Sequence, residues 1–139
     1  NDRISYIFCI MENGQLGHLY FGKRLTHRDS FQHFIQMRTQ SHTAYVYEDD
    51  FLFTLDTIRQ EYPSYGTTDF REPAYQIKQE NGSRITEFAY KSHEIYKGKK
   101  KLKGLPATYI EAEDDAVTVE ILLEDALLSA QMILSYTIY

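Results

Sequence analysis

Hydrophobic and polar side chains alternate with a period of two along much of the chain, a pattern typical of strands with one buried face. The clearest run is a series in which every second residue is apolar: Leu128, Ala130, Met132, Leu134, Tyr136 and Ile138. Other strand-like runs span 5–10, 16–21, 51–55, 75–79, 84–96, 108–111 and 117–123. With few helical patterns among them, these runs predict about eight short strands and an all-β fold, an antiparallel β-sandwich.

Two Asn-Gly pairs separate strand-like runs. Asn13-Gly14 lies between the first two runs, and Asn81-Gly82 lies between 75–79 and 84–96. Because both residue types tolerate positive φ, each pair predicts a hairpin turn. The alternation slips between Ile85 and Phe88, which predicts a β-bulge there.

The segment 24–50 breaks the pattern. Residues 27–38 have a loosely helical spacing of apolar side chains, whereas 41–50 is polar and has no period. We expect a long excursion with at most one helical turn. A loop of that length in a small domain usually has a function or lies at an interface.

Composition narrows the class of protein. A chain of 139 residues, with 42% hydrophobic and 25% charged residues, suits one domain, spanning 1–139. The net charge of −5 argues against a nucleic-acid surface, and no apolar run is long enough for a membrane helix. Cys9 is the only cysteine, which excludes an intrachain disulfide and, with no visible signal peptide, favours the cytoplasm. Strand patterns close to both ends also suggest a piece of a longer protein.

Patterns that carry chemistry are scarce. The five histidines have no zinc-ligand spacing, and there is no nucleophile or phosphate-loop motif, so we expect no metal and no cofactor. The acidic pairs at 49–50 and 113–115 fall in turn-like segments, where carboxylates are common. Five lysines within 97–103 favour a solvated loop or a protected sheet edge over a phosphate or nucleic-acid patch. The 12 Tyr and 8 Phe fit sheet packing better than sugar binding, since Trp is absent.

One turn-rich segment, 60–75, stands out as a loop that presents side chains. It contains Tyr65, Asp69, Phe70 and Arg71 around glycine and proline. In a strand, Asp69 and Arg71 would lie on one face, with Phe70 on the other. The two charged residues are either an ion pair that braces the loop or a clamp for another domain or a ligand hydroxyl.

Several motifs in the same order resemble those of glycoside hydrolase family 36, the bacterial-type α-galactosidases. The matching stretches are 12–23, 60–74, 80–83, 96–99 and 104–109, and the sharpest is Tyr-Gly-x-x-Asp-Phe-Arg at 65–71. The resemblance implies the N-terminal supersandwich domain of that family, of the galactose-mutarotase-like type. It also implies that this chain is a truncated part of that domain and precedes a (β/α)₈ barrel.

In that family the barrel carries two catalytic aspartates that hydrolyse terminal α-galactosides, of the melibiose and raffinose type, with retention. The resemblance therefore implies no catalytic residue and no activity in 1–139 alone. It implies docking of this domain on its own barrel and on neighbouring subunits, in a homo-oligomer that is often a tetramer. We expect Tyr65, Asp69, Phe70 and Arg71 to belong to that docking surface.

A loop of the N-terminal domain helps to shape the sugar pocket in related enzymes, and the excursion 24–50 is its equivalent here. An aspartate of that loop contacts substrate in relatives, but the ungapped count reaches Arg38, which becomes the candidate substrate-binding residue. Two alternatives stay open: an independent carbohydrate-binding module, and a pure protein-interaction domain.

Overall fold

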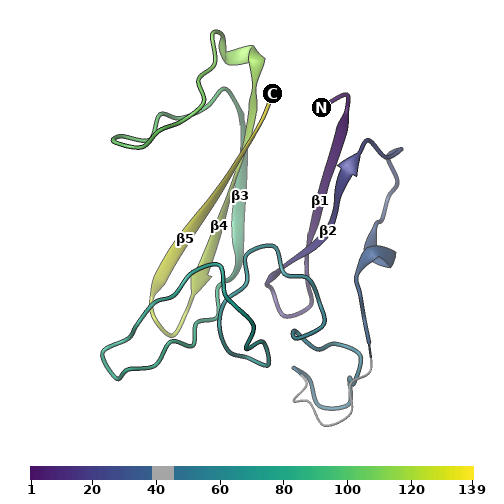
Figure 1. Cartoon of the computed structure of the whole chain (residues 1–139), viewed down its shortest axis with the longest axis vertical. Helices are drawn as coiled ribbons and strands as arrows, with labels where there is room; N and C mark the ends of the chain where they lie inside the picture. The colour runs from purple at the N-terminus through teal and green to yellow at the C-terminus, as the bar shows by residue number, and fades with distance from the viewer. Residues whose placement is uncertain (39–45) are drawn as a thin grey trace.

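The computed structural model describes residues 1–38 and 46–139, and these residues form an all-β fold of antiparallel sheets. The predicted fold class is confirmed. The chain folds into a two-stranded and a three-stranded sheet, which face one another with most of the loop segments gathered at one end and the β3–β4 loop projecting at the other (Figure 1). The first sheet consists of β1 (Ile4–Ile10) and β2 (Leu16–Lys23). The second has the order β3 (Ala89–Lys97), β4 (Val117–Asp125) and β5 (Ala130–Ile138).

The hairpin predicted at Asn13-Gly14 connects β1 and β2. Its loop closes with the Met11 N–H donating to the Gln15 carbonyl at 2.8 Å and the Gly14 N–H donating to the Met11 carbonyl at 2.9 Å. The closing pair leaves a three-residue loop, 12–14, rather than the two-residue loop of a primed turn. Accordingly, only Gly14 of the Asn-Gly pair has positive φ, at 80°. Asn13 contributes through its side chain, whose oxygen accepts from the Gln15 N–H.

The alternation at the end of the sequence is confirmed in β5. Its even-numbered side chains up to Tyr136 are partly buried, and the odd-numbered side chains from 131 to 135 are exposed. The inward face packs on a cluster formed by Leu16, Phe88, Ile121 and Leu123. This cluster lies between the two sheets and forms the larger part of the core.

Three of the predicted strands are wrong: 51–55, 75–79 and 108–111 contain no strand. In the first, the Asp50 carboxylate accepts hydrogen bonds from the Leu52 and Phe53 N–H groups, and this side-chain bonding replaces a ladder with a turn. Phe53 and Leu55 are nevertheless buried, in a second core cluster with Met11 and Ile58. Burial explains the apolar pattern there without a strand.

The Asn81-Gly82 turn forms, but no ladder flanks it. Gly82 has φ 87°, and the Gln79 N–H donates to the Ser83 carbonyl at 2.9 Å. The bulge is also displaced from its predicted place: the β3–β4 register shifts between Tyr90 and Ser92. The backbone before Ala89 is therefore loop, and the irregularity falls inside β3.

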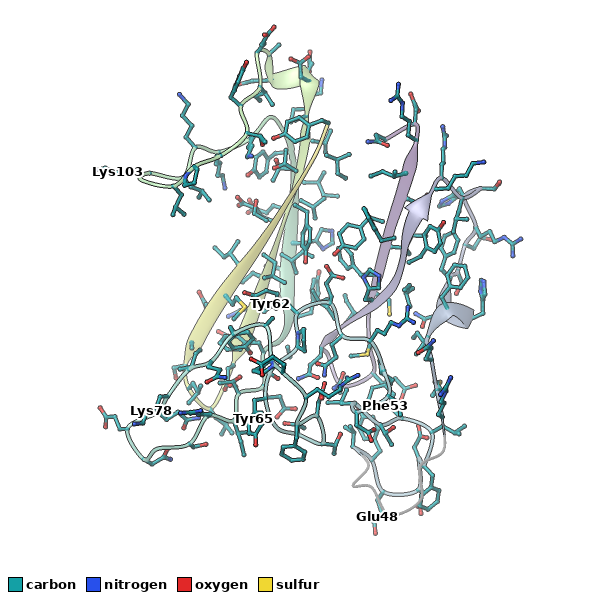
Figure 2. The ribbon with its side chains drawn as sticks, in the orientation of Figure 1. Glu48, Phe53, Tyr62, Tyr65, Lys78 and Lys103 are labelled. Atoms are coloured by element: carbon teal, nitrogen blue, oxygen red, sulfur yellow. The ribbon has the colours of Figure 1, made fainter. Side chains whose placement is uncertain are left out.

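The lysine-rich run lies in an exposed loop that projects from the three-stranded sheet, with Lys103 near its end (Figure 2). Two of its lysines are paired: Lys97 with Asp114 and Lys100 with Glu120, both at 2.6 Å. A short 3₁₀ helix, η2 (Glu113–Asp115), closes the loop. The interpretation as a solvated loop is confirmed.

In its described part, the excursion after β2 holds a single helical turn, the 3₁₀ helix η1 (Gln32–Phe34). Residues 39–45 of the predicted excursion lie outside the described residues. In the parts of the chain that the structure describes, no helix is long and apolar enough to cross a membrane.

Candidate domain-docking site

The segment 65–71, called the 65–71 loop from here on, is built on a tight turn. Gly66 and Asp69 exchange both backbone hydrogen bonds, at 2.7 and 3.0 Å. The two residues between them, Thr67 and Thr68, have φ of 51° and 77°. Positive φ at both central positions defines a primed turn, and it is unusual for β-branched residues. The loop is therefore strained, at a cost of roughly 1–3 kcal/mol per residue.

Neighbouring groups hold this turn in place. A Cβ at Gly66 would lie 2.9 Å from Ile85 Cγ2, so the backbone packs directly on that side chain. The Thr68 hydroxyl accepts a hydrogen bond from the Leu55 N–H at 3.3 Å. These contacts fix the direction in which the loop presents its side chains.

Asp69 and Arg71 form an ion pair within the loop. The buried Asp69 carboxylate, 2% exposed, accepts from Arg71 Nε and Nη2 at 2.8 Å each and from Gln60 Nε2 at 2.8 Å. It also accepts from the Arg71 backbone N–H at 3.1 Å. Burial alone would raise the Asp69 pKa, but the bonds and charge of Arg71, with the Gln60 bond, outweigh burial and hold that pKa below its usual value. Bonding to Asp69 likewise raises the pKa of Arg71.

Arg71 also binds backbone. Its Nη2 donates to the carbonyls of Leu55 and Ile58, at 2.8 and 3.0 Å. The Nη1 group makes no hydrogen bond to the described residues, and half of the side chain is exposed. Arg71 thus reaches the surface as a guanidinium with fixed orientation and free donors. The bracing interpretation of the pair is confirmed, and the clamp interpretation stays a prediction.

The apolar side chains of the loop face solvent. Phe70 is 65% exposed and Tyr65 is 37% exposed, and their rings meet edge to face with centroids 5.5 Å apart. Tyr65 lies at the loop-bearing end of the molecule, away from the termini (Figures 1 and 2). Shallow hollows of about 390 and 230 Å³ flank Arg71 on its two sides. Exposed aromatics around an oriented arginine are the residue types enriched at interface hot spots.

Arg38 lies apart from this loop, on the excursion. It is exposed, it follows η1, and it immediately precedes the undescribed residues 39–45. No described residue accepts a hydrogen bond from it. Arg38 does not lie with the docking residues, and its substrate-binding role stays a prediction.

Sequence reasoning missed a buried polar cluster around Glu61. Its carboxylate, 4% exposed, accepts hydrogen bonds from the hydroxyls of Tyr6 and Tyr136 and pairs with His18 Nδ1, the last at 2.9 Å. Burial, followed by the bonds to Glu61 and its charge, raises the pKa of both tyrosines above their ordinary value. The cluster ties β1, β2 and β5 together. Its members are far apart in the sequence. The only one that the sequence motifs include is Glu61, in the 60–75 segment.

Among the described residues, no group of three or more His, Cys, Asp or Glu side chains could hold a metal ion. His18 and His93 are instead hydrogen-bonded, to Glu61 and to the Tyr90 hydroxyl. In both clusters a buried carboxylate braces its neighbours, and the 65–71 loop presents Tyr65 and Phe70 to solvent.

Comparison with known proteins assigns the family. Residues 14–139 match the glycosyl hydrolase family 36 N-terminal domain. The chain belongs to glycosyl hydrolase family 36. It is 45% identical over 99% of its length to the α-galactosidase AgaA of Geobacillus stearothermophilus, and 34% identical over its whole length to α-galactosidase Mel36A of Lactobacillus acidophilus.

Solved structures of family 36 enzymes agree with the fold. The α-galactosidase from Lactobacillus brevis superimposes with a TM-score of 0.93 at 37% identity, over 100% of this chain. AgaA in complex with raffinose superimposes with a TM-score of 0.91 at 45% identity, over 99% of this chain. The chain spans only 19% of the length of each of these relatives. The family 36 N-terminal domain is therefore the part of such enzymes to which this chain corresponds.

Proposed function

We propose that this chain is part of the non-catalytic N-terminal domain of a cytoplasmic α-galactosidase, and that the parent enzyme hydrolyses terminal α-galactosides of the raffinose and melibiose type with retention. One observation carries the proposal: 45% identity over 99% of the chain to an α-galactosidase. The catalytic aspartates belong to the barrel outside this chain. The single cysteine supports the cytoplasmic location.

The carboxylates of the described residues support a non-catalytic role. Retaining glycosidases need two carboxyl groups about 5–5.5 Å apart on either side of the scissile bond. Asp69 and Glu61 are buried and saturated with internal hydrogen bonds. The acidic runs at 49–50 and 113–115 lie in short turns, and 113–115 is exposed. Asp69 and Glu61 therefore brace the fold.

The docking role rests on the 65–71 loop. Its turn is strained yet held by Ile85 and by the Leu55 backbone, its two aromatic rings are exposed, and Arg71 offers free donors beside them. We assign Tyr65, Phe70 and Arg71 to direct contact with the catalytic barrel or a neighbouring subunit, and Asp69 to holding Arg71 in position. Oligomerisation of the parent and a pocket-edging role for the 24–50 excursion, with Arg38 at the sugar, complete the proposal.

The test is an assay of the full-length parent with raffinose and melibiose, alongside residues 1–139 alone. Galactose release by the parent and none by the chain alone is the expected result. A parent that releases no galactose from either sugar contradicts the proposed activity. A titration of the isolated chain with galactose, followed by amide NMR shifts, addresses the alternative of an independent sugar-binding module, and we expect no shifts.

A further inference from the structure

The chain contains the tripeptide Glu-Asn-Gly twice, at 12–14 and at 80–82. Asparagine is among the thermolabile residues of proteins, and a following glycine exposes it to attack, because glycine has no Cβ to shield its backbone nitrogen. That nitrogen attacks the side-chain carbonyl carbon of the asparagine, ammonia leaves, and water opens the succinimide ring that results. The two tripeptides are identical, so a large difference in reactivity between them must come from the fold.

The first site, Asn13-Gly14, is held on every side. The Gly14 N–H donates to the Met11 carbonyl at 2.9 Å, and the Gly14 carbonyl accepts from the Tyr90 N–H at 2.7 Å. A Cβ on that glycine would lie 3.1 Å from a methyl group of β3. The amide that must leave is also engaged, since Asn13 Nδ2 donates to Gln15 Oε1 at 2.9 Å. Attack at this site requires the β1–β2 connection to open.

The second site, Asn81-Gly82, is open. Both residues are exposed, and their turn projects from the loop-bearing end of the molecule, beside Lys78 (Figure 2). No atom lies within 4 Å of where a Gly82 Cβ would be, and Asn81 Nδ2 has no hydrogen-bond partner among the described residues. The Gly82 N–H donates to the Gln79 carbonyl at 3.0 Å. No strand flanks this turn, so breaking that bond costs little compared with opening the first site.

A backbone donor is already aimed at the reacting side chain. The Ser83 N–H donates to Asn81 Oδ1 at 2.9 Å, and negative charge develops on this oxygen when the glycine nitrogen attacks. A donor placed where charge develops stabilises the transition state. Asn13 Oδ1 has a similar donor, the Gln15 N–H at 3.2 Å. The freedom of the glycine nitrogen and of the leaving amide therefore distinguishes the two sites.

We propose that Asn81 is a site of spontaneous covalent modification in the folded protein, converted through a succinimide to aspartate and isoaspartate, whereas the fold protects Asn13. The bond from the Gly82 nitrogen to Asn81 Cγ forms as the bond from Cγ to Nδ2 breaks. The glycine proton passes to base, the leaving amide takes a proton from water, and a second water opens the ring. Each product carries an added negative charge, and isoaspartate also lengthens the main chain by a methylene group.

The modified turn is connected to the 65–71 loop. Gln79 Nε2 donates to the Ile85 carbonyl at 2.7 Å, and the Ile85 side chain packs on the backbone of Gly66. Conversion of Asn81 therefore alters a turn that supports the 65–71 loop. The proposal itself depends neither on docking nor on enzymatic activity, and its test uses neither.

The experiment incubates the folded full-length protein in H₂¹⁸O at mildly alkaline pH, because the attacking nitrogen must lose its proton. Heavy oxygen enters when the succinimide is hydrolysed, so digestion in ordinary water followed by mass spectrometry counts only the conversions that took place in the folded protein. Fragmentation by electron transfer separates isoaspartate from aspartate. Asn13 is the matched internal control, and a parallel incubation in urea removes the structure around both sites.

In the folded protein, conversion of Asn81 should exceed that of Asn13 on the order of tenfold, which corresponds to a difference of about 1.4 kcal/mol in the cost of opening the two turns. In urea the two conversions should be similar. Three results overturn the proposal: equal conversion of both asparagines in the folded protein, no conversion of Asn81 there, and a preference for Asn81 that is as strong in urea.

Discussion

Asp69 is a buried carboxylate whose hydrogen bonds come from Arg71 and Gln60, both within its own domain. A buried ion pair adds little to the free energy of unfolding compared with apolar residues of the same size. Removing one member of the pair is costly, because the other charge stays without its partner. Arg71 is half exposed, so water would recover part of its solvation if Asp69 lost its charge. The side chain therefore acts as a support for Arg71 rather than as a catalytic group.

We expect Asp69→Asn to lower the free energy of unfolding by roughly 2–4 kcal/mol, since the amide cannot bind the guanidinium as a carboxylate does. The pKa of Asp69 is lower in the folded state than in the unfolded chain. Its stabilisation is therefore fully present above the unfolded pKa of about 3.9, and it is lost as pH falls through the folded pKa. Urea unfolding followed by circular dichroism between neutral and strongly acidic pH measures this.

The difference between wild type and Asp69→Asn should be constant near neutral pH and should narrow in acid. Asp114→Asn is the matched control, because Asp114 is 78% exposed and its pair with Lys97 is a surface one. We expect that control to stay within about 0.5 kcal/mol of wild type. A gap for Asp69→Asn that persists unchanged in strong acid would contradict the ion-pair explanation.

Arg38 poses a different question, since it is exposed and free of described partners. If it donates to sugar hydroxyls, Arg38→Ala in the parent enzyme should raise KM for raffinose several-fold, consistent with a loss of about 1 kcal/mol. Chain stability should not change. Arg28→Ala, on the same excursion and also exposed, is the control. Equal kinetics for both variants and wild type would remove Arg38 from the pocket.

At the scale of elements, the sequence predicted those features whose cause is local. The alternation of β5 and the glycines at both Asn-Gly turns follow from side-chain period and backbone φ. The segment 51–55 was mistaken for a strand because burial of Phe53 and Leu55 imitates a strand pattern, while the deciding bonds come from Asp50. The cluster around Glu61 could not be foreseen, because Tyr6 and Tyr136 meet only through the sandwich.

That cluster joins the two sheets, which gives the tyrosine hydroxyls a measurable role. Tyr136→Phe removes a donor to a buried carboxylate and should cost about 1–3 kcal/mol. Because the folded-state pKa of Tyr136 lies above its ordinary value, this contribution is present below about pH 10 and is lost as pH rises further. Urea unfolding at neutral and alkaline pH checks both statements.

Tyr109→Phe provides the comparison, since Tyr109 is 79% exposed and lies on the projecting loop. We expect Tyr109→Phe to match wild type at every pH. The result that would rule out a bracing role for the Tyr136 hydroxyl is equal stability of Tyr136→Phe and wild type at neutral pH.

At the scale of the whole molecule, two unsatisfied surfaces lie at opposite ends. A hollow of about 750 Å³ between β1 and β5 lies at the termini, and Tyr65 marks the other end (Figures 1 and 2). The first is lined by both apolar and polar side chains, whereas the second presents exposed rings on a strained turn. This separation leaves the 65–71 loop accessible to a partner whatever occupies the hollow at the other end.

The docking surface can be tested without disturbing the fold. Phe70 is 65% exposed and its side chain makes no hydrogen bond, so Phe70→Ala should change the stability of residues 1–139 by no more than about 0.5 kcal/mol. In the parent enzyme the same change should weaken docking by about 2 kcal/mol or more if Phe70 is a hot spot. Domain docking is measured by the rate of limited proteolysis between domains, and assembly by analytical ultracentrifugation.

Leu127→Ala is the control, because Leu127 is 93% exposed on the β4–β5 turn. If proteolysis and assembly are unchanged while KM rises, the 65–71 loop contacts the sugar pocket instead, and the docking assignment is wrong.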